Sequence, residues 1–352
     1  MRADVLSLEA AGYRCHALHA PDRVWTETNC AADLWIEALH ALGHDPVPGL
    51  AFTLGTDFDG DQWRMFTFPE QTLDELYGIE VDELNVWRPL RRHVAEQLSF
   101  GHLVAFDADA WWLPDTAGLT YRCAHQKTTL LAVMIDTDER RLGYLHNTGY
   151  YELAGEDFDA LLPSHPAPDV MPPYTLQVRL AGARKRRPAD PAVVRRLAAH
   201  HLGRRPSRNP VTRMAASAGA ELPRLRDEGL DAFHRWAFGT VRQCGANAEL
   251  AAAFCQYLVG SGLEEAQRAV VAFERVAVGM KAAELALARA VRGRHVDVEG
   301  VFEPLAGDWA SAVASAAAAL AGALADEPEV GRNAAAQDPV AFATTAGEPA
   351  YS

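Results

Sequence analysis

The sequence predicts an α+β protein in which a mixed half with an antiparallel sheet precedes a mainly α-helical half. Three observations carry this prediction: short alternating and apolar runs in the first half, an Ala-rich helical periodicity after Met214, and five prolines within 163–174. The 352 residues are 49% apolar and 23% charged, as is typical of a soluble globular protein. We therefore expect a first domain at 1–175, a helical domain at 176–325 and a disordered tail at 326–352, where apolar periodicity is weak.

The segment Cys30–Leu42 predicts an amphipathic helix. Its apolar residues are spaced three and four apart, at Ala31, Leu34, Trp35, Ala38, Leu39 and Leu42. Gly43 supplies a C-terminal stop, and Pro46 follows it. Cys30 is therefore the first residue of this helix or its cap.

Three later runs predict strands, at His102–Asp107, Thr128–Ile135 and Arg141–Leu145. The second run is almost entirely apolar, so we expect it to lie centrally in the sheet. The polar run Asp136–Arg140 predicts a tight turn that joins the last two strands into a hairpin. The expected order is a helix first and then an antiparallel sheet.

Helices are expected in the second half around 191–202, 227–242, 246–259, 263–292 and 308–325. Their high content of Ala, Leu and Glu favours helix over strand.

The net charge of −14 is spread unevenly along the chain. Between Arg179 and Arg213 there are eleven Arg or Lys residues and a single acid, Asp190. A solvated helix face would explain this segment, and so would a docking site for an anionic partner such as a phosphopantetheine arm or an acidic carrier protein. The acidic remainder would repel nucleic acid. No apolar run reaches membrane-spanning length and the N-terminus lacks the apolar stretch of a signal peptide, so the sequence predicts a cytoplasmic protein without membrane partners.

The five cysteines are an odd number without a CxxC pair, which argues against a disulfide scaffold and a thiolate zinc site. Free cysteines are most often small buried hydrophobic residues. Cys30 differs because a helix N-terminus stabilises a thiolate through its free N–H groups and its dipole. It is therefore the candidate nucleophile.

A nucleophilic cysteine needs a base and a group that orients the base. His125 opens the segment HQKTTLLAVMID, which forms the first strand of the predicted hairpin, and Asn147 ends the second strand, so we expect both at the same end of the sheet. We predict that Cys30 is the nucleophile, His125 the base and acid, and Asn147 the orienting group. His146 is a rival base, but alternation along a strand sends neighbouring side chains to opposite faces, so we expect it to point outward.

This chain order resembles that of the papain-like cysteine enzymes. FDADAWWLPDTAG at 106–118, followed by His125 and a hairpin that ends in Asn147, resembles the family of the butirosin biosynthesis protein H N-terminal domain. LWIEALHALG, DQW and GYYEL are similar to a family of uncharacterised bacterial proteins often associated with carrier-protein biosynthesis. The resemblance covers about residues 10–160. Asn147 stands where the butirosin protein family usually has Asp, although papain itself uses Asn.

The resemblance implies a papain-like fold and an acyltransferase activity. Cys30 would take an acyl or aminoacyl group from a thioester on the phosphopantetheine arm of an acyl or peptidyl carrier protein. A small amine or other nucleophile would then receive it, with no tightly bound cofactor and no metal. A cysteine hydrolase (thioesterase, amidase or peptidase) with the same residues is an alternative, as is a non-catalytic protein that binds a carrier protein.

Other residues near the predicted site are candidates for an oxyanion hole or for the wall of the cleft. The Cys30 amide is the first candidate oxyanion donor, with the side chain of Asn29 or Thr28 as a second. Asp107 and Asp115 precede the histidine, and carboxylates lining the cleft would suit an amine acceptor. Turn capping explains these aspartates equally well.

The acidic loop at Asp57, Asp59 and Asp61 resembles a calcium loop. Phe68 stands where such a loop requires Glu, so the sequence favours a turn between strands over a metal site.

Overall fold

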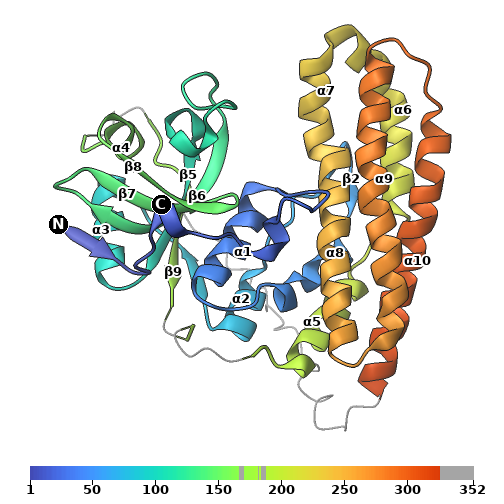
Figure 1. Cartoon of the computed structure of the whole chain (residues 1–352), viewed down its shortest axis with the longest axis horizontal. Helices are drawn as coiled ribbons and strands as arrows, with labels where there is room; N and C mark the ends of the chain where they lie inside the picture. The colour runs from blue at the N-terminus through green and yellow to red at the C-terminus, as the bar shows by residue number, and fades with distance from the viewer. Residues whose placement is uncertain (166–169, 181, 184–187, 326–352) are drawn as a thin grey trace, which may run out of the picture.

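The computed structural model describes residues 1–165, 170–180, 182–183 and 188–325. They form an antiparallel sheet followed along the chain by a helical region, which confirms the predicted α+β class. Figure 1 shows the sheet on one side of the molecule and the long helices on the other. The predicted tail at 326–352 lies outside the described residues.

Seven strands form the main sheet, in the order β4-β9-β5-β6-β7-β8, with β1 pairing β6 near its end. All of these pairs are antiparallel. The strands are β1 (Arg2–Asp4), β4 (Glu80–Glu83), β5 (Leu103–Asp109), β6 (Lys127–Asp136), β7 (Arg141–His146), β8 (Gly149–Ala154) and β9 (Thr175–Arg179). The three predicted strands and the hairpin are confirmed as β5, β6 and β7. β6 is central, and it is buried from Leu130 to Ile135.

Two strands depart from the expected order of a helix followed by a sheet. β1 precedes the helix, and β9 follows the proline-rich connection yet pairs with both β4 and β5. The sheet therefore extends beyond the predicted boundary at 175 to Arg179.

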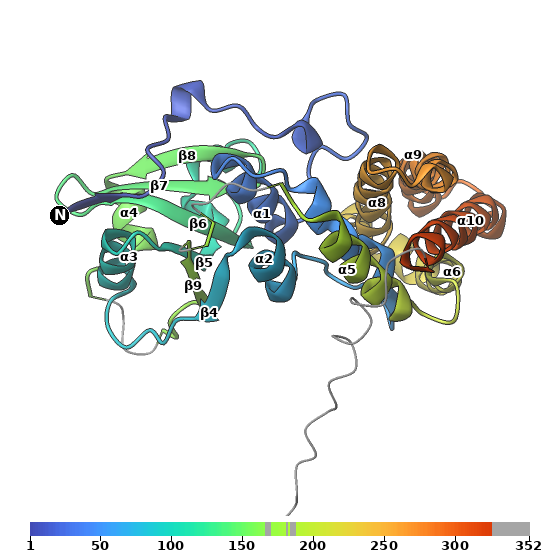
Figure 2. The ribbon, with the colours of Figure 1, turned by 90° about the horizontal axis from the view of Figure 1, so that it is seen from below.

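Helix α1 (Cys30–Ala41) confirms the predicted amphipathic helix, but it is buried more completely than a single apolar face requires. Asn29 caps it, because its Oδ1 accepts hydrogen bonds from the amides of Ala31 and Ala32 at 3.1 and 3.0 Å. Every residue from Ala32 to Leu39 is buried. The reason is that α1 lies between the sheet and the helical region (Figure 2).

The helical region contains α5 (Pro191–Gly203), α6 (Pro210–Glu228), α7 (Leu230–Ala237), α8 (Gln243–Gly260), α9 (Gln267–Val291) and α10 (Val298–Ala325). A π-helical turn, Phe238–Arg242, joins α7 to α8. The predicted helices at 191–202, 246–259, 263–292 and 308–325 are confirmed with shifted ends. The prediction at 227–242 corresponds to α7 with the π-helical turn. α6 was not predicted; it begins with Pro210 and contains Pro223, and an interior proline normally breaks a helix.

Shorter helices complete the first half: α2 (Glu70–Tyr77), α3 (Leu90–Ser99) and α4 (Glu156–Leu161). α3 packs against β5 and β6. None of the helices in the described part of the chain has both the length and the apolarity that a membrane crossing requires.

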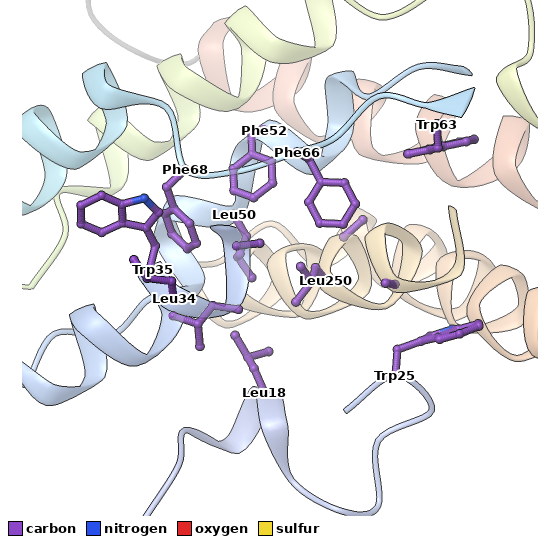
Figure 3. Close-up of a cluster of buried hydrophobic side chains, with 14 of the residues drawn as sticks. Leu18, Trp25, Leu34, Trp35, Leu50, Phe52, Trp63, Phe66, Phe68 and Leu250 are labelled. Carbon is purple, nitrogen blue, oxygen red and sulfur yellow. The ribbon is translucent and has the colours of Figure 1, made fainter. Parts of the chain in front are cut away.

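The two regions share one hydrophobic core. Leu34 from α1, Leu50 from the 3-10 helix Val47–Gly55, Leu250 from α8 and Trp25 all belong to this core (Figure 3). The 3-10 helix also packs against α5 and α8. Because the core is continuous, the helical region packs against the segment that leads into α1 and holds it in place.

The acidic loop is a turn between the short strands β2 (Phe58–Asp59) and β3 (Gln62–Trp63), as predicted. Asp57 pairs with Arg213 of α6, and Asp59 pairs with Arg64 at 2.8 Å. In the described ranges no three or more His, Cys, Asp or Glu side chains are grouped to hold a metal ion.

Arginines of the basic segment, Arg179–Arg213, form ion pairs with acidic residues of the first half. Arg179 pairs with Glu80 at 2.7 Å, and Arg196 pairs with Glu75. Arg184 to Arg187 lie outside the described residues.

Candidate functional site

Cys30 lines a cavity of about 330 Å³ where the N-terminus of α1, the start of β6, the β7–β8 turn and the π-helical turn meet. The predicted site residues that line it are Thr28, Asn29, Cys30 and Asn147. It is also lined by Glu27, Thr128, His146 and Arg242, among others. His125, Asp107 and Asp115 are not among its lining residues.

The Cys30 thiol is half-buried and faces the sheet. Its Sγ lies 4.0 Å from Oγ1 of Thr129, whose hydroxyl donates to Asp107 at 2.8 Å. Lys127 pairs with the same carboxylate at 2.9 Å. Asp107 thus lines a neighbouring hollow of about 320 Å³, which shares Lys127 and Met65 with the Cys30 cavity.

His125 lies outside the cavity. Its Nδ1 donates to Asp109 at 2.6 Å and its ring stacks on Trp111, with the ring centroids 4.5 Å apart. The side chain is 70% exposed. Burial opposes ionisation of Asp109, but hydrogen bonds from His125 and from two backbone amides outweigh it and lower the pKa of Asp109. The predicted pairing of His125 with Asn147 is therefore corrected, because the partner of His125 is Asp109.

His146 is buried, which corrects the expectation that it points outward. Its Nδ1 donates to Asp115 at 2.6 Å, and its Nε2 lies 2.8 Å from the hydroxyl of Thr128. Tyr144 donates to the same carboxylate at 2.5 Å. Burial, and then the Asp115 charge, raise the pKa of Tyr144, which keeps the phenol protonated as a donor. With Nδ1–H on Asp115, Nε2 carries the lone pair and accepts from Thr128.

Asp115 therefore does not line the cleft. Its side chain is 3% exposed and lies behind His146. The segment 110–121, which carries Asp115, packs against His146, so the ring is buried although it lines the Cys30 cavity. His146 and Asp115 are 31 residues apart in the chain, so no local sequence pattern predicted that they pair.

Asn147 occupies the two-residue turn between β7 and β8, where His146 pairs with Gly149. Its φ of 45° is left-handed, a conformation that Asn adopts more readily than most residues. Among the described residues no hydrogen bond joins Asn147 to a histidine. The hydrogen-bond partners of the two rings are carboxylates instead, Asp109 for His125 and Asp115 for His146.

Neither side chain proposed as the second oxyanion donor has a hydrogen left to donate. Asn29 Nδ2 donates to the Phe66 carbonyl at 3.1 Å and to Gln243 at 3.2 Å. The Thr28 hydroxyl donates to Asp33 at 2.6 Å. The backbone N–H of Cys30 has no acceptor within the described ranges, as expected at the first position of a helix. It stays the candidate donor.

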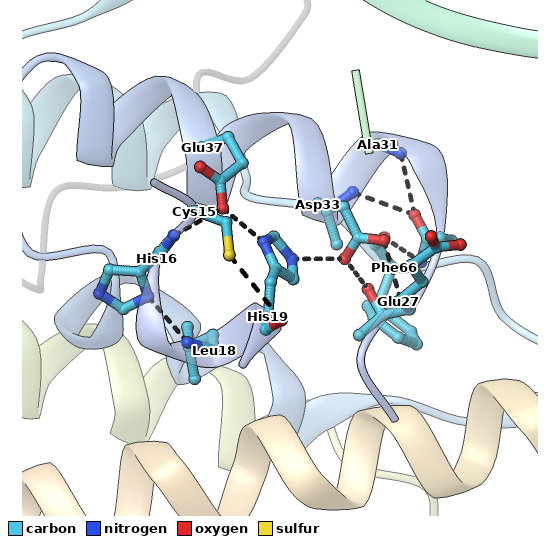
Figure 4. A network of polar contacts seen from close by, with 12 residues as sticks. Cys15, His16, Leu18, His19, Glu27, Ala31, Asp33, Glu37 and Phe66 are labelled. Atoms are coloured by element: carbon cyan, nitrogen blue, oxygen red, sulfur yellow. Dashed lines mark hydrogen bonds and ion pairs between the residues drawn. The ribbon is translucent and has the colours of Figure 1, made fainter. Parts of the chain in front are cut away.

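A buried ionic cluster holds the segment in front of Cys30 (Figure 4). Asp33 accepts from the amide of Thr28 at 2.8 Å and from His19 Nε2 at 3.2 Å. On the other side of the ring, Nδ1 of His19 lies 2.5 Å from Glu37, which also accepts from Tyr13 at 2.6 Å. The imidazolium thus pairs with both buried carboxylates, which compensates for their loss of hydration.

This cluster predicts that stability depends on pH. Burial lowers the pKa of His19, but Asp33 and Glu37 outweigh it and raise the pKa to about 9. Protonated His19 contributes a few kcal/mol to the free energy of unfolding. This contribution is fully present below about pH 6.5 and is lost as the pH rises through about 9. Chemical denaturation between pH 6 and 10 should show this loss in the wild type and a flatter profile in His19→Gln. Equal slopes in the two proteins would contradict the assignment.

The helical region holds the same segment from the opposite side. Glu249 of α8 accepts from the amides of Val24 and Trp25 at 3.0 and 2.8 Å. Gln243 donates to the Thr28 carbonyl at 3.1 Å. Trp25 lies directly against Gly245, where an added methyl group would meet the indole at 2.6 Å. A glycine is therefore required where α8 receives this ring.

Comparison with family models gives two adjoining matches. The DUF1839 N-terminal domain matches residues 14–180 and the DUF1839 C-terminal domain matches residues 175–318. A search of curated proteins found no match. The two models together span the sheet except β1, the Cys30 cavity and most of the helical region. The chain therefore belongs to the DUF1839 family.

Proposed function

We propose that this protein is a cysteine-dependent acyltransferase that forms an acyl-enzyme at Cys30. The observation that carries the proposal is the shared cavity: a thiol at a helix N-terminus and a buried histidine polarised by a carboxylate line the same space. We also propose that the domain with the sheet is a papain-like catalytic domain that resembles the N-terminal domain of butirosin biosynthesis protein H.

In the first step His146 Nε2 takes the proton of the Cys30 thiol, and the resulting thiolate attacks the carbonyl carbon of a carrier-protein thioester. The developing oxyanion accepts a hydrogen bond from the Cys30 amide. The carbon–sulfur bond to the pantetheine arm then breaks, and the departing thiolate takes a proton from His146 Nε2. Because no hydrogen bond joins Cys30 to His146 among the described residues, the substrate must bind between them or bring them together.

In the second step an amine attacks the acyl-Cys30 carbonyl and gives up a proton to His146. The Cys30 sulfur leaves and takes that proton back from His146, and the amide is released. Water in place of the amine would give hydrolysis. Phe238 and Arg242 bring the helical region to the cavity rim, where a bound acceptor would limit the access of water.

The assay is release of free carrier thiol from a panel of acyl- and aminoacyl-loaded carrier proteins, with and without small amines. We expect amine-dependent release with formation of the corresponding amide. Release that is independent of amine and yields the free acid would make the protein a hydrolase. A loaded carrier that binds without any release, even with all amines present, would favour the non-catalytic carrier-binding protein.

A further inference from the structure

Arg242, at the end of the π-helical turn, is a cation without a carboxylate partner inside the Cys30 cavity. Its Nη2 donates to the Glu27 carbonyl at 3.2 Å, and its guanidinium lies 5.7 Å from the centroid of the Phe238 ring. Its Nε is buried and has no hydrogen-bond partner. No Asp or Glu of the described residues lies within ion-pair distance of Arg242.

The surrounding charges make this arrangement unusual. Lys127, the other Lys or Arg of the cavity wall, is already paired with Asp107 at 2.9 Å. Asp33 is engaged by His19 and Thr28. An arginine has five N–H donors, and leaving a buried donor unsatisfied costs on the order of 1–3 kcal/mol. The Nε atoms of Arg23, Arg88 and Arg213 are also buried without a hydrogen-bond partner, but each of these arginines pairs with a carboxylate, which Arg242 lacks among the described residues.

The backbone at this point also departs from a regular helix. The five residues from Phe238 to Arg242 form a π-helical turn, and such turns are frequent at functional sites because the extra residue redirects side chains. The turn is continuous with α8, whose Gln243 holds Thr28 and Asn29. Arg242 is therefore fixed relative to the segment that carries Cys30.

We propose that Arg242 binds the carboxylate of a small substrate, carried on the acyl donor or on the acceptor. A guanidinium matches a carboxylate through two parallel hydrogen bonds. The phosphate of a pantetheine arm is a poorer candidate, because an extended arm spans on the order of 15 Å. A cavity of about 330 Å³ suits a small molecule better than that full length. The inference rests on the proposed function by naming its substrate class.

Calorimetric titration of the Cys30→Ala protein tests this inference separately from the chemistry, since that variant forms no acyl-enzyme. The probes are N-acetylglycine, its amide N-acetylglycinamide, and inorganic phosphate. We expect N-acetylglycine to bind, and Arg242→Gln in the same background to weaken that binding about tenfold or more. The amide should bind weakly and equally to both proteins.

Glu27→Gln is the matched control, because Glu27 lines the same cavity and has no ion-pair partner among the described residues. Removing its negative charge should leave N-acetylglycine binding unchanged or tighten it. Circular dichroism and the thermal midpoint check folding, and Arg242→Lys, which keeps the charge, should retain part of the affinity. The proposal is overturned if N-acetylglycine does not bind, if Arg242→Gln binds it as well as the parent does, if the amide competes equally, or if phosphate alone binds.

Discussion

Replacement of Cys30 with alanine is expected to lower the rate of acyl transfer by about a thousandfold or more, while the protein stays folded. Removing the nucleophile removes the covalent route entirely, and only substrate binding and the Cys30 amide remain to assist the reaction. The side chain is half-buried and its Sγ has one weak contact, with Thr129 at 4.0 Å, so the loss of stability should be small. Steady-state thiol release and thermal unfolding measure the two effects.

Cys123→Ala is the matched control. The Cys123 thiol is exposed and donates a hydrogen bond to the Leu119 carbonyl. Cys123 does not lie at the N-terminus of any helix in the described ranges. Its removal should leave the rate unchanged. Cys244 and Cys255 are buried, and burial raises the pKa of both thiols, so neither is available as a nucleophile at neutral pH. Full activity in Cys30→Ala, with loss of activity in Cys123→Ala, would reverse the assignment.

The second large effect separates the two candidate bases. His146→Gln is expected to lower the rate by about a hundredfold to ten thousandfold, because glutamine can donate to Asp115 but cannot exchange a proton. His125→Gln should have little effect, since His125 is exposed, stacked on Trp111 and outside the cavity. The measurement is the pH profile of kcat/KM for each variant.

The role of Asp115 supplies the control for His146. Asp115→Asn preserves the shape of the site but removes the charge that orients the ring and stabilises its protonated form. Its rate should fall, although less than in His146→Gln, because the imidazole itself is retained. If His125→Gln abolishes activity while His146→Gln does not, the base predicted from the sequence is restored and its partner is Asp109.

The sequence predicts the parts of this fold that local patterns encode. The spacing of apolar residues identified α1, and the apolar run of β6 with its polar turn identified the central hairpin. Asn29 was not identified as the cap, although its side chain satisfies two free amides of α1. β9 was missed because its partners lie about 70 to 100 residues away and its five residues follow a run of prolines.

The site was predictable to a smaller extent. Cys30 is identifiable because a helix start is a local feature, and Asn147 was correctly placed at the end of the hairpin. The pairing of histidines with carboxylates could not be predicted, because the hydrogen bond between His146 and Asp115 depends on how the segment after β5 folds over the sheet. Arg242 gave no signal at all, since its place at the cavity depends on the docking of α8 against the segment before α1.

The most direct test of the central claim is the intact mass of the protein after incubation with a loaded carrier protein and an acid quench. We expect an increase equal to the mass of the acyl group in the wild type and none in Cys30→Ala, and peptide mapping should locate the group on Cys30. In His146→Gln the adduct should form much more slowly. An adduct on another residue, or turnover in the wild type with no adduct under any quench time, would contradict the account.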